Sequence, residues 1–423
     1  MNRLIQPDIT LPNKIEFTKP EKTSLDNGIK VYKLNGGEQE ICRIEIVFDA
    51  GKKHQSKPLI GALTNEMLLE GSDGISGKEI SNQIDFYGAF IQTECHQDHA
   101  AVIVYTLNKY LDNVLSLLSK VAFKPDFNQA EVDILRKNLR QSFLVNSDKV
   151  GTLARRRFTT ELFKNHAYGK IATLNDFDNV NTNELKEFYS ANYNGKSFEI
   201  FITGNLNSNI DNLLNKYFGQ QKFADNIAKE DSVVLPNIPG FHLEEKADAI
   251  QSGIRIGRTM FNRLDSDFFG MQVLNYTLGG YFGSRLMSNI REDKGYTYGI
   301  GSALVSLKEG GYFFITTEVG EQHTENTLKE ITFEIDKLKQ DLLSEEELTT
   351  VKNSIVGNFL KSTDGVFAMM DSYKELHAYD LDYDYYANYL DTVRNITSSD
   401  IRILAEKYLD ESLFTKVVSG KKF

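Results

Sequence analysis

Arg291 and Tyr298 are the two residues whose types and spacing point most directly to chemistry. They lie in Ile290-Arg291-Glu292-Asp293-Lys294-Gly295-Tyr296-Thr297-Tyr298, which is predicted to form a helix end, a turn at Gly295 and the start of a strand. This geometry would bring both side chains close to one polar target. Both can donate hydrogen bonds to a peptide carbonyl, and the guanidinium keeps its charge at any physiological pH. The pair could therefore hold a peptide and stabilise an oxyanion.

A glycine-rich turn precedes this segment, in Leu278-Gly279-Gly280-Tyr281-Phe282-Gly283-Ser284-Arg285-Leu286. No Lys-Ser/Thr ending follows, so the turn is not a phosphate-binding loop. Gly279, Gly280 and Gly283 are expected to allow tight turns and close packing, and so to shape the loop beside Arg291. Ordinary structural roles remain open for the pair, since an arginine near a helix C-terminus complements the macrodipole and a tyrosine packs well in a sheet.

The composition is typical of a globular protein, and it argues against several classes of partner. The chain has 423 residues, which suits two domains. Its net charge of −11 argues against nucleic acid or an anionic membrane as partner. Two cysteines, Cys42 and Cys95, are too few for a disulfide framework. With no apolar run long enough to span a bilayer and no signal peptide pattern, we expect a cytoplasmic protein.

The chain repeats itself at an offset of 216 residues. Helical patterns over 128–144 and 344–360 correspond, as do a helix and strand over 183–204 and 399–420. Chance similarity of amphipathic helices is the alternative explanation. Period-two alternation predicts strands over 30–34 and 42–48, and further strands are expected to continue the sheets over 101–105 in the first copy and 311–317 in the second.

These patterns predict an α+β fold with two similar domains, each a mostly antiparallel sheet with helices packed on one face. The boundaries expected are 1–225 for the first domain, 226–240 for a linker containing Pro236 and Pro239, and 241–423 for the second domain.

The sequence resembles the insulinase or pitrilysin-type (inverzincin) zinc peptidases, which include the mitochondrial processing peptidases and small bacterial relatives. The resemblance spans almost the whole chain. It rests on the glycine-rich turn with Arg291 and Tyr298, on His166-Ala167-Tyr168-Gly169, and on the duplication. Active members carry His-x-x-Glu-His on a helix and a Glu ligand about 75 residues later, which together hold a catalytic zinc.

The helix equivalent to the zinc helix has lost these groups. It lies in 60–72, and the resemblance places Ala62 and Glu66 at the histidine positions and Asn65 at the position of the general base. The window for the distal ligand, 136–143, contains no carboxylate. Alanine cannot bind a metal and asparagine cannot act as a base near neutral pH. We therefore expect no metal and no catalytic residues of its own in this chain.

The only histidines close in sequence are His96 and His99, in Glu94-Cys95-His96-Gln97-Asp98-His99. If this segment is a strand, residues three apart face opposite sides, so the two rings would diverge. They are expected to be ordinary surface or sheet histidines.

The resemblance implies one half of a peptidase clamshell formed by two chains around a chamber. The chain resembles the zinc-less sister subunit, which donates the Arg–Tyr pair to the zinc site of a homologous, zinc-bearing partner. We therefore expect a non-catalytic, peptide-binding subunit of a heterodimeric zinc endopeptidase that is inactive alone. The alternatives are a scaffold protein within a larger complex and a catalytically inactive peptide-binding protein, including a homodimer.

Overall fold

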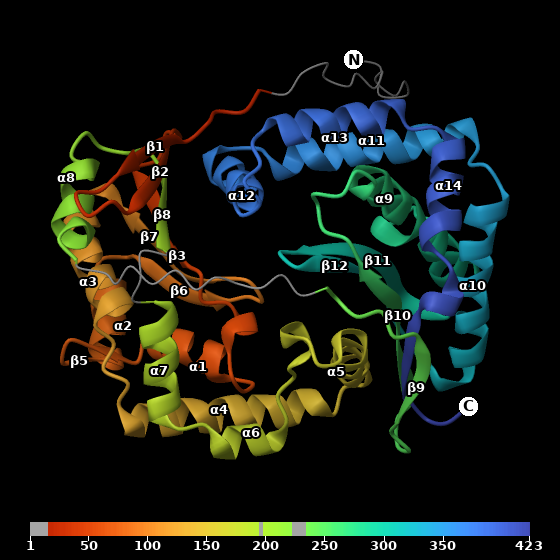
Figure 1. Cartoon of the computed structure of the whole chain (residues 1–423), viewed down its shortest axis with the longest axis horizontal. Helices are drawn as coiled ribbons and strands as arrows, with labels where there is room; N and C mark the ends of the chain where they lie inside the picture. Colours follow the sequence, from red (N-terminus) through yellow and green to blue (C-terminus); the bar gives the residue numbers. More distant parts are fainter. Residues whose placement is uncertain (1–15, 194–197, 222–233) are drawn as a thin grey trace.

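Two β-sheets organise the molecule, each with its own set of helices (Figure 1). The computed structural model describes residues 16–193, 198–221 and 234–423. The fold is the predicted one, with two sheet-plus-helix units. In the described residues, no helix combines the length and apolar character needed to cross a membrane.

The first sheet has the strand order β1-β2-β8-β3-β7-β6, and only β2 and β8 pair in parallel. Its strands are β1 (Glu21–Ser24), β2 (Lys30–Asn35), β3 (Ile41–Phe48), β6 (Phe90–Cys95), β7 (Ala100–Leu107) and β8 (Phe198–Gly204), and a small hairpin adds β4 (Gly71–Ser72) and β5 (Ile75–Ser76). The helices of this half are α1 (Ile60–Met67), α2 (Gly77–Phe86), α3 (Leu111–Phe123), α4 (Gln129–Ser147), α5 (Val150–Phe163), α6 (Leu174–Asn179), α7 (Thr182–Asn192) and α8 (Ile210–Leu214). Four short helices complete it: η1 (Lys52–His54), η2 (Asn108–Tyr110), η3 (Ala167–Gly169) and η4 (Asn215–Gly219).

The second sheet has the order β11-β12-β10-β13-β9, and only β13 and β9 pair in parallel. Its strands are β9 (Gly240–Glu245), β10 (Gln251–Met260), β11 (Thr297–Leu307), β12 (Gly310–Gly320) and β13 (Thr415–Gly420). Its α-helices are α9 (Phe268–Asn275), α10 (Thr324–Gln340), α11 (Glu345–Ser362), α12 (Val366–His377), α13 (Asp384–Asn395) and α14 (Ser398–Tyr408). Two π-helical segments, η5 (Tyr276–Gly280) and η6 (Met287–Asp293), and two short helices, η7 (Glu321–His323) and η8 (Glu411–Leu413), complete this half.

The internal repeat is confirmed at the level of elements. α7 and α14 start and end at positions related by the offset of 216, and the strands that follow them occupy equivalent places beside a parallel neighbour. Both helices begin with a capping box, formed by Asn181 with Glu184 and by Thr397 with Asp400. In each box the side chain of the first residue accepts a hydrogen bond from the backbone N–H three residues later. The acidic side chain at that later position accepts a hydrogen bond from the backbone N–H of the first residue. The predicted strands in both halves are also confirmed.

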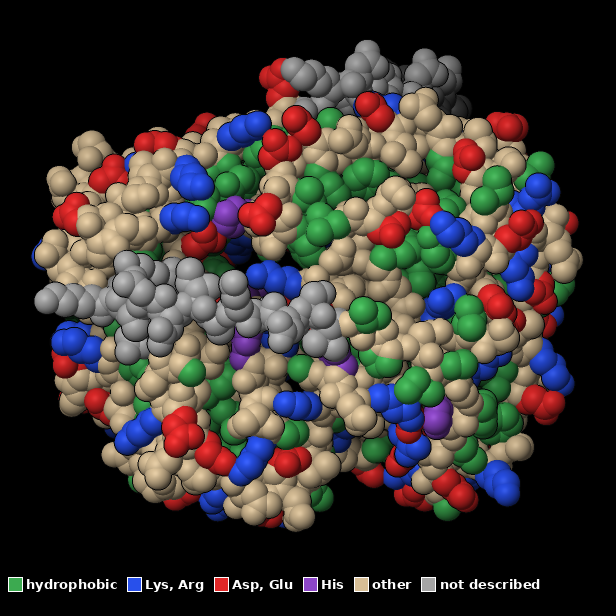
Figure 2. All heavy atoms as spheres, in the orientation of Figure 1, with side chains coloured by type: hydrophobic (Ala, Val, Ile, Leu, Met, Phe, Trp, Pro, Cys, Tyr) green, Lys and Arg blue, Asp and Glu red, His purple; other side chains and the backbone are tan. Residues whose placement is uncertain are grey.

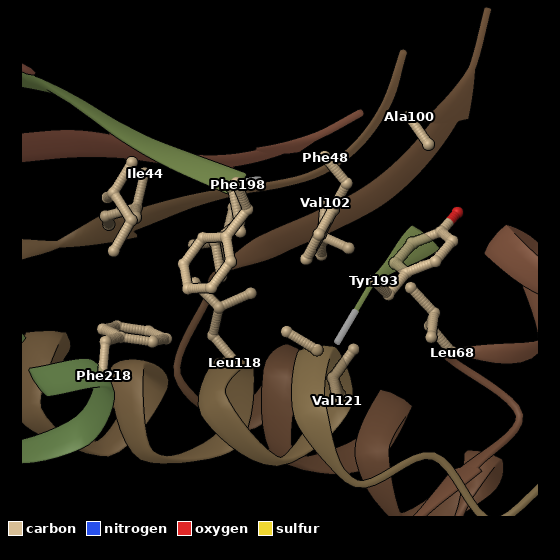
Figure 3. Packing of buried hydrophobic residues seen from close by; sticks show 14 of the residues in the cluster. Ile44, Phe48, Leu68, Ala100, Val102, Leu118, Val121, Tyr193, Phe198 and Phe218 are labelled. Atoms are coloured by element: carbon tan, nitrogen blue, oxygen red, sulfur yellow. The ribbon is translucent and has the colours of Figure 1, made fainter. Parts of the chain in front are cut away.

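The two faces of the first sheet pack against different helices. On one face of the first sheet, β3, β7 and β8 pack against α3 through apolar side chains, including Ile44, Phe48, Val102, Leu118 and Phe198 (Figure 3). The opposite face carries Tyr32, Leu34 and Phe201, which pack against Met370 of α12. Because successive side chains on a strand point to opposite faces, Val31 and Tyr32 belong to different cores.

The two halves exchange equivalent helices. α12 belongs to the second half of the sequence but covers a face of the first sheet, whereas α5 belongs to the first half and covers a face of the second sheet (Figure 1). The two helices are related by the same offset of 216. We predicted helices on one face of each sheet, and each half does cover one face of its own sheet with its own helices. The other face of each sheet is covered by a helix from the opposite half. The predicted boundary at 225 falls among residues that are not described, as do residues 226–233 of the linker, so these boundaries remain a prediction.

Charged residues also join α12 to the first sheet. Arg43 of β3 donates from both terminal nitrogens to Asp371 of α12, at 2.8 and 3.0 Å, and its Nε lies 2.8 Å from Glu45. Lys374 of α12 pairs with the same Glu45. Arg43 and Glu45 are both buried. Burial opposes ionisation of Asp371, but the contact with Arg43 holds the pKa of this carboxyl below its ordinary value.

Phe158→Ala, on α5, is expected to lower the free energy of unfolding by about 3–5 kcal/mol, because the ring is buried between α5 and the second sheet and its loss would leave a cavity. Phe86→Ala is the matched control, since Phe86 is 79% exposed on α2. The control should stay within about 0.5 kcal/mol of the wild type. Chemical denaturation measures both values, and equal effects would contradict the packing of α5 on the second sheet.

Candidate functional site

Arg291 lies near the end of η6, and its side chain is held in two ways. Its Nε donates to the backbone carbonyl of Tyr298 at 2.9 Å, and its guanidinium carbon lies 4.7 Å from the centroid of the Phe282 ring. The predicted order of helix end, turn at Gly295 and strand is confirmed. Gly295 has a φ of +67°, a backbone conformation that glycine adopts without strain.

Tyr298 lies on a β-bulge at the start of β11. Thr297 pairs with Val319 and Ile300 pairs with Thr317, so Tyr298 and Gly299 together oppose one residue of β12. The hydroxyl of Thr317 donates to the Gly299 carbonyl at 3.0 Å and fixes the bulge. A bulge breaks the regular alternation of a strand and can redirect a side chain. The Tyr298 side chain is accordingly turned out of the sheet and is 96% exposed.

This arrangement leaves hydrogen-bond donors available on both residues. The Nε of Arg291 is used by the backbone of Tyr298, and Nη1 lies only loosely near Glu292, at 3.8 Å. The terminal nitrogens of the guanidinium and the phenol hydroxyl can therefore still donate to an added acceptor. Such a pair can bind a carbonyl or a carboxylate. The convergence of both groups on one target remains a prediction.

The glycine-rich turn is packed tightly against β11. A Cβ on Gly279 would lie 2.6 Å from the backbone nitrogen of Ser302. Cβ atoms on Gly280 and Gly283 would instead approach the rings of Tyr276 and Tyr281, at 3.1 and 2.9 Å. The sequence did not indicate that η5 and η6 are π-helical. Such single-turn segments often occur at functional sites, and here they bracket the turn.

The degenerate zinc helix is α1. Ala62 and Glu66 are half-buried on it, whereas Asn65 is 1% exposed. The Asn65 side chain accepts from the hydroxyl of Tyr193 at 3.0 Å and donates to the Ala101 carbonyl at 3.5 Å. Asn65 therefore joins α1 to β7 and to the end of α7, which is a structural role.

Glu66 is the one ionisable group among the three degenerate positions. Burial raises the pKa of its carboxyl, and the neighbouring charge of Glu70 raises it further, while Lys52 acts in the opposite direction. In the described residues, no group of three or more His, Cys, Asp or Glu side chains is arranged to hold a metal ion.

His96 and His99 do not lie in a strand, so the divergence of their rings that a strand would impose is not found. β6 ends at Cys95 and β7 starts at Ala100, so the two histidines lie in the connecting hairpin turn rather than in a strand. Their ring centroids are 4.8 Å apart. Burial lowers the pKa of His99 to about 4, and the nearby His96 contributes to this shift. A turn reverses the chain and brings together residues that a strand would separate.

The His166–Gly169 motif joins the two halves of the molecule. Tyr168 donates to Asp98 in the turn between β6 and β7, at 2.5 Å, and Nε2 of His166 lies 2.8 Å from Glu309 in the turn between β11 and β12. Asp98 also accepts from the backbone nitrogen of Lys308 at 3.1 Å. Sequence reasoning did not single out Glu309, because nothing in a single sequence indicates that these two hairpins meet.

Comparison with known proteins identifies the family. A model described as insulinase (peptidase family M16) matches residues 31–174, and a model described as the peptidase M16 inactive domain matches residues 179–355. The chain belongs to peptidase family M16, and the resemblance to insulinase-type peptidases is confirmed.

The names of two relatives differ in whether they describe an active or an inactive protease. An uncharacterised zinc protease of Bacillus subtilis, YmxG, is 21% identical over 83% of this chain and 86% of its own length. A probable inactive metalloprotease of the same organism, YmfF, is 24% identical over 73% of this chain and 74% of its own length. The crystal structure of a peptidase M16 inactive domain from Pseudomonas fluorescens superimposes with a TM-score of 0.85, at 22% identity, over 96% of this chain and 98% of that one. This last similarity shows the fold.

Proposed function

We propose that this chain is the non-catalytic, substrate-binding subunit of a heterodimeric zinc endopeptidase that cleaves peptides. Arg291 and Tyr298 would contribute to the zinc site of a homologous partner chain. The observation that carries this proposal is the contrast between the two halves. The second half presents an arginine and a fully exposed tyrosine at a bulge, whereas the first half has only Ala62, a buried Asn65 and Glu66 where metal ligands and a base would be needed.

The residues present in α1 do not fit a catalytic zinc. Ala62 has no donor atom, and the Asn65 amide is already bonded to Tyr193 and Ala101. Glu66 alone could offer a ligand, and a zinc site needs three protein ligands or more. We derive no step of the reaction from a metal in this chain.

The contribution of this chain would be to bind and orient the peptide. The guanidinium of Arg291 has its orientation fixed by the Tyr298 carbonyl and by the Phe282 ring, so little side-chain freedom would be lost on binding. With Tyr298, it would donate to the carbonyl of the scissile bond, and these bonds would strengthen as negative charge develops on that oxygen. The exposed phenol would become enclosed only when the partner chain is present.

Two features bear on where this would happen and on what substrate. Cys42 and Cys95 are both free thiols, which is typical of a reducing compartment, and we place the protein in the cytoplasm. The net charge of −11 would favour peptides with basic residues.

The chain purified alone is expected to contain no stoichiometric zinc and to cleave no peptide, because it lacks the ligands and the base. Elemental analysis and a peptidase assay measure both. Mixing with a family member from the same organism that carries an intact His-x-x-Glu-His motif should then yield a complex with peptidase activity above that of the partner alone. One tightly bound zinc per chain in the isolated protein would contradict the proposal. A complex whose activity does not exceed that of the partner would favour a scaffold instead.

A further inference from the structure

A cavity of about 460 Å³ lies in the second half of the molecule, away from α1. It is partly open to solvent and is lined by α9, α11, α12 and α13, by the first residue of η5 and by Arg263. Its volume falls in the range of small-ligand pockets, roughly 300–1,000 Å³. Figure 2 shows hydrophobic side chains gathered in the upper middle of the view, in the region between α12 and α9.

The walls of this cavity combine aromatic side chains with polar ones. Phe269 of α9 packs edge-on against Tyr385 of α13, with ring centroids 4.6 Å apart, and Tyr389 lies 5.5 Å from Phe269 on the other side. The other aromatic lining residues are Phe268 of α9, Tyr276 of η5, Phe359 of α11 and Tyr386 of α13. Rings in such a cluster offer faces and edges to an added ring at favourable geometry.

Two tyrosine hydroxyl groups in the lining are available to a ligand. Buried tyrosines normally place their hydroxyl on a hydrogen-bond partner. Tyr383, which directly precedes α13, and Tyr386 of α13 do so, each donating to a backbone carbonyl at 3.1 Å. Tyr385 and Tyr389, by contrast, are half-buried, and within residues 16–193, 198–221 and 234–423 their hydroxyls have no protein partner and stay open to solvent. A ligand that entered the cavity could supply one.

The charged residues of the lining are already paired. Arg263 donates to the Glu375 carbonyl at 3.2 Å and lies 3.6 Å from its carboxylate, and Asp371 is held by Arg43. The cavity therefore presents no unpaired charge among the described residues, and an uncharged occupant suits it better than an ion.

An aromatic side chain from an extended segment already docks beside the cavity. Phe17, in the coil before β1, stacks on Tyr383 with centroids 4.6 Å apart and packs against Phe359 and Tyr386, both of which line the cavity. The same cluster is thus able to accept a phenylalanine that is delivered by a stretch of chain without regular structure.

The cavity is also connected to the glycine-rich turn. Tyr276, which lines it, stacks face to face on Tyr281 at 4.7 Å. Tyr281 directly precedes Phe282, whose ring lies under Arg291. An occupant of the cavity would therefore contact Tyr276, which packs on the residue next to the ring that supports Arg291.

We propose that this cavity is a side-chain binding pocket that takes an uncharged aromatic residue of an extended peptide. This inference rests on the proposed function, because it assigns the pocket to the same peptide that Arg291 and Tyr298 bind. The pocket would select peptides by an aromatic residue at a distance from the scissile bond.

The test uses the full chain and two kinds of probe. The first is a series of fluorescein-labelled peptides of one length, made of alanine and serine with a single phenylalanine at successive positions, together with the peptide that lacks phenylalanine. The second is N-acetylphenylalaninamide, with N-acetylalaninamide as its control. Ala368→Phe, on α12, fills the pocket from its wall, and Ala387→Phe, exposed on α13 and outside the lining, is the matched control.

Phenylalanine at one or two positions is expected to strengthen peptide binding roughly tenfold or more, the effect of burying an aromatic side chain. Ala368→Phe should abolish this gain and Ala387→Phe should retain it. If Ala368→Phe does not fold, as judged by its thermal unfolding, Gln272→Phe fills the same pocket from α9.

Four results would overturn the inference. Equal binding of peptides with and without phenylalanine would overturn it. Binding by Ala368→Phe at the wild-type strength would also overturn it. Peptide binding that is lost in Arg291→Ala but is insensitive to Ala368→Phe would overturn the pocket and leave the proposed function standing. Binding of N-acetylphenylalaninamide alone, with no peptide bound, would overturn both and make the cavity a site for a free aromatic compound.

Discussion

Arg291→Ala, assayed in the complex with a zinc-bearing partner, is expected to lower kcat by roughly 100-fold or more, the scale of losing one oxyanion donor. The loss should appear in kcat more than in KM, because the bond to the carbonyl oxygen strengthens mainly in the transition state. Tyr298→Phe removes only the hydroxyl and should also lower kcat. Folding should be little affected, since Tyr298 is 96% exposed and the contacts of Arg291 are local ones, with the Tyr298 carbonyl, the Phe282 ring and, loosely, Glu292.

The matched control is Arg402→Ala on α14, where an arginine pairs loosely with Glu406 at 3.6 Å on the same helix. It should leave kcat within about twofold of the wild type, since a surface ion pair contributes about 1 kcal/mol at most and does not act on the reaction. A kcat that is unchanged in Arg291→Ala would reduce Arg291 and Tyr298 to packing residues and would remove the basis of the proposed function.

Gly279→Ala is expected to lower activity in the complex by roughly 100-fold, although Gly279 touches no substrate. Its added Cβ would lie 2.6 Å from the backbone nitrogen of Ser302, so the turn or β11 must shift. Arg291 follows the turn and Tyr298 lies near the start of β11, so a shift of about 1 Å would move the two residues relative to each other. Misplacement of this size can lower the reaction rate about 100-fold. Overpacking should also lower the free energy of unfolding by about 1–3 kcal/mol.

Gly357→Ala provides the control for this substitution. Gly357 is exposed in α11, and a Cβ there would meet nothing within 4 Å. The change should stabilise the protein by about 0.5–1 kcal/mol, since alanine favours a helix interior, and should leave turnover unchanged. Steady-state kinetics and denaturant unfolding of both variants give the comparison. If Gly279→Ala behaved like Gly357→Ala, the close packing of the turn on β11 would be unimportant for the site.

Local pattern was enough to predict most elements of this fold. Alternation identified β3 and β7, and N-cap residues placed the starts of α4 and α11 within a residue. The offset of 216 also gave the right equivalences between the two halves. These features depend on neighbours along the chain, which is the information that a single sequence contains.

Features that depend on distant parts of the chain were not predictable. The amphipathic patterns of α5 and α12 show that each has a face to bury, but they do not say which sheet will cover it. The bulge at Tyr298 depends on hydroxyl groups from β11 and β12, and the meeting of His166 with Glu309 depends on two hairpins. At the candidate site, residue types, spacing and the family resemblance singled out Arg291 and Tyr298 as candidates, but Phe282 beneath the guanidinium emerged only from the structure.

The exchange of α5 and α12 has a consequence for synthesis on the ribosome. The face of the first sheet that carries Tyr32 and Phe201 must wait for residues 366–377, which emerge only after most of the second half has been translated. The nascent first half therefore exposes an apolar surface for much of its translation, a state that chaperones commonly bind. Each half needs a helix from the other half to cover its sheet. The two copies of the repeat therefore complete their folding together rather than one after the other.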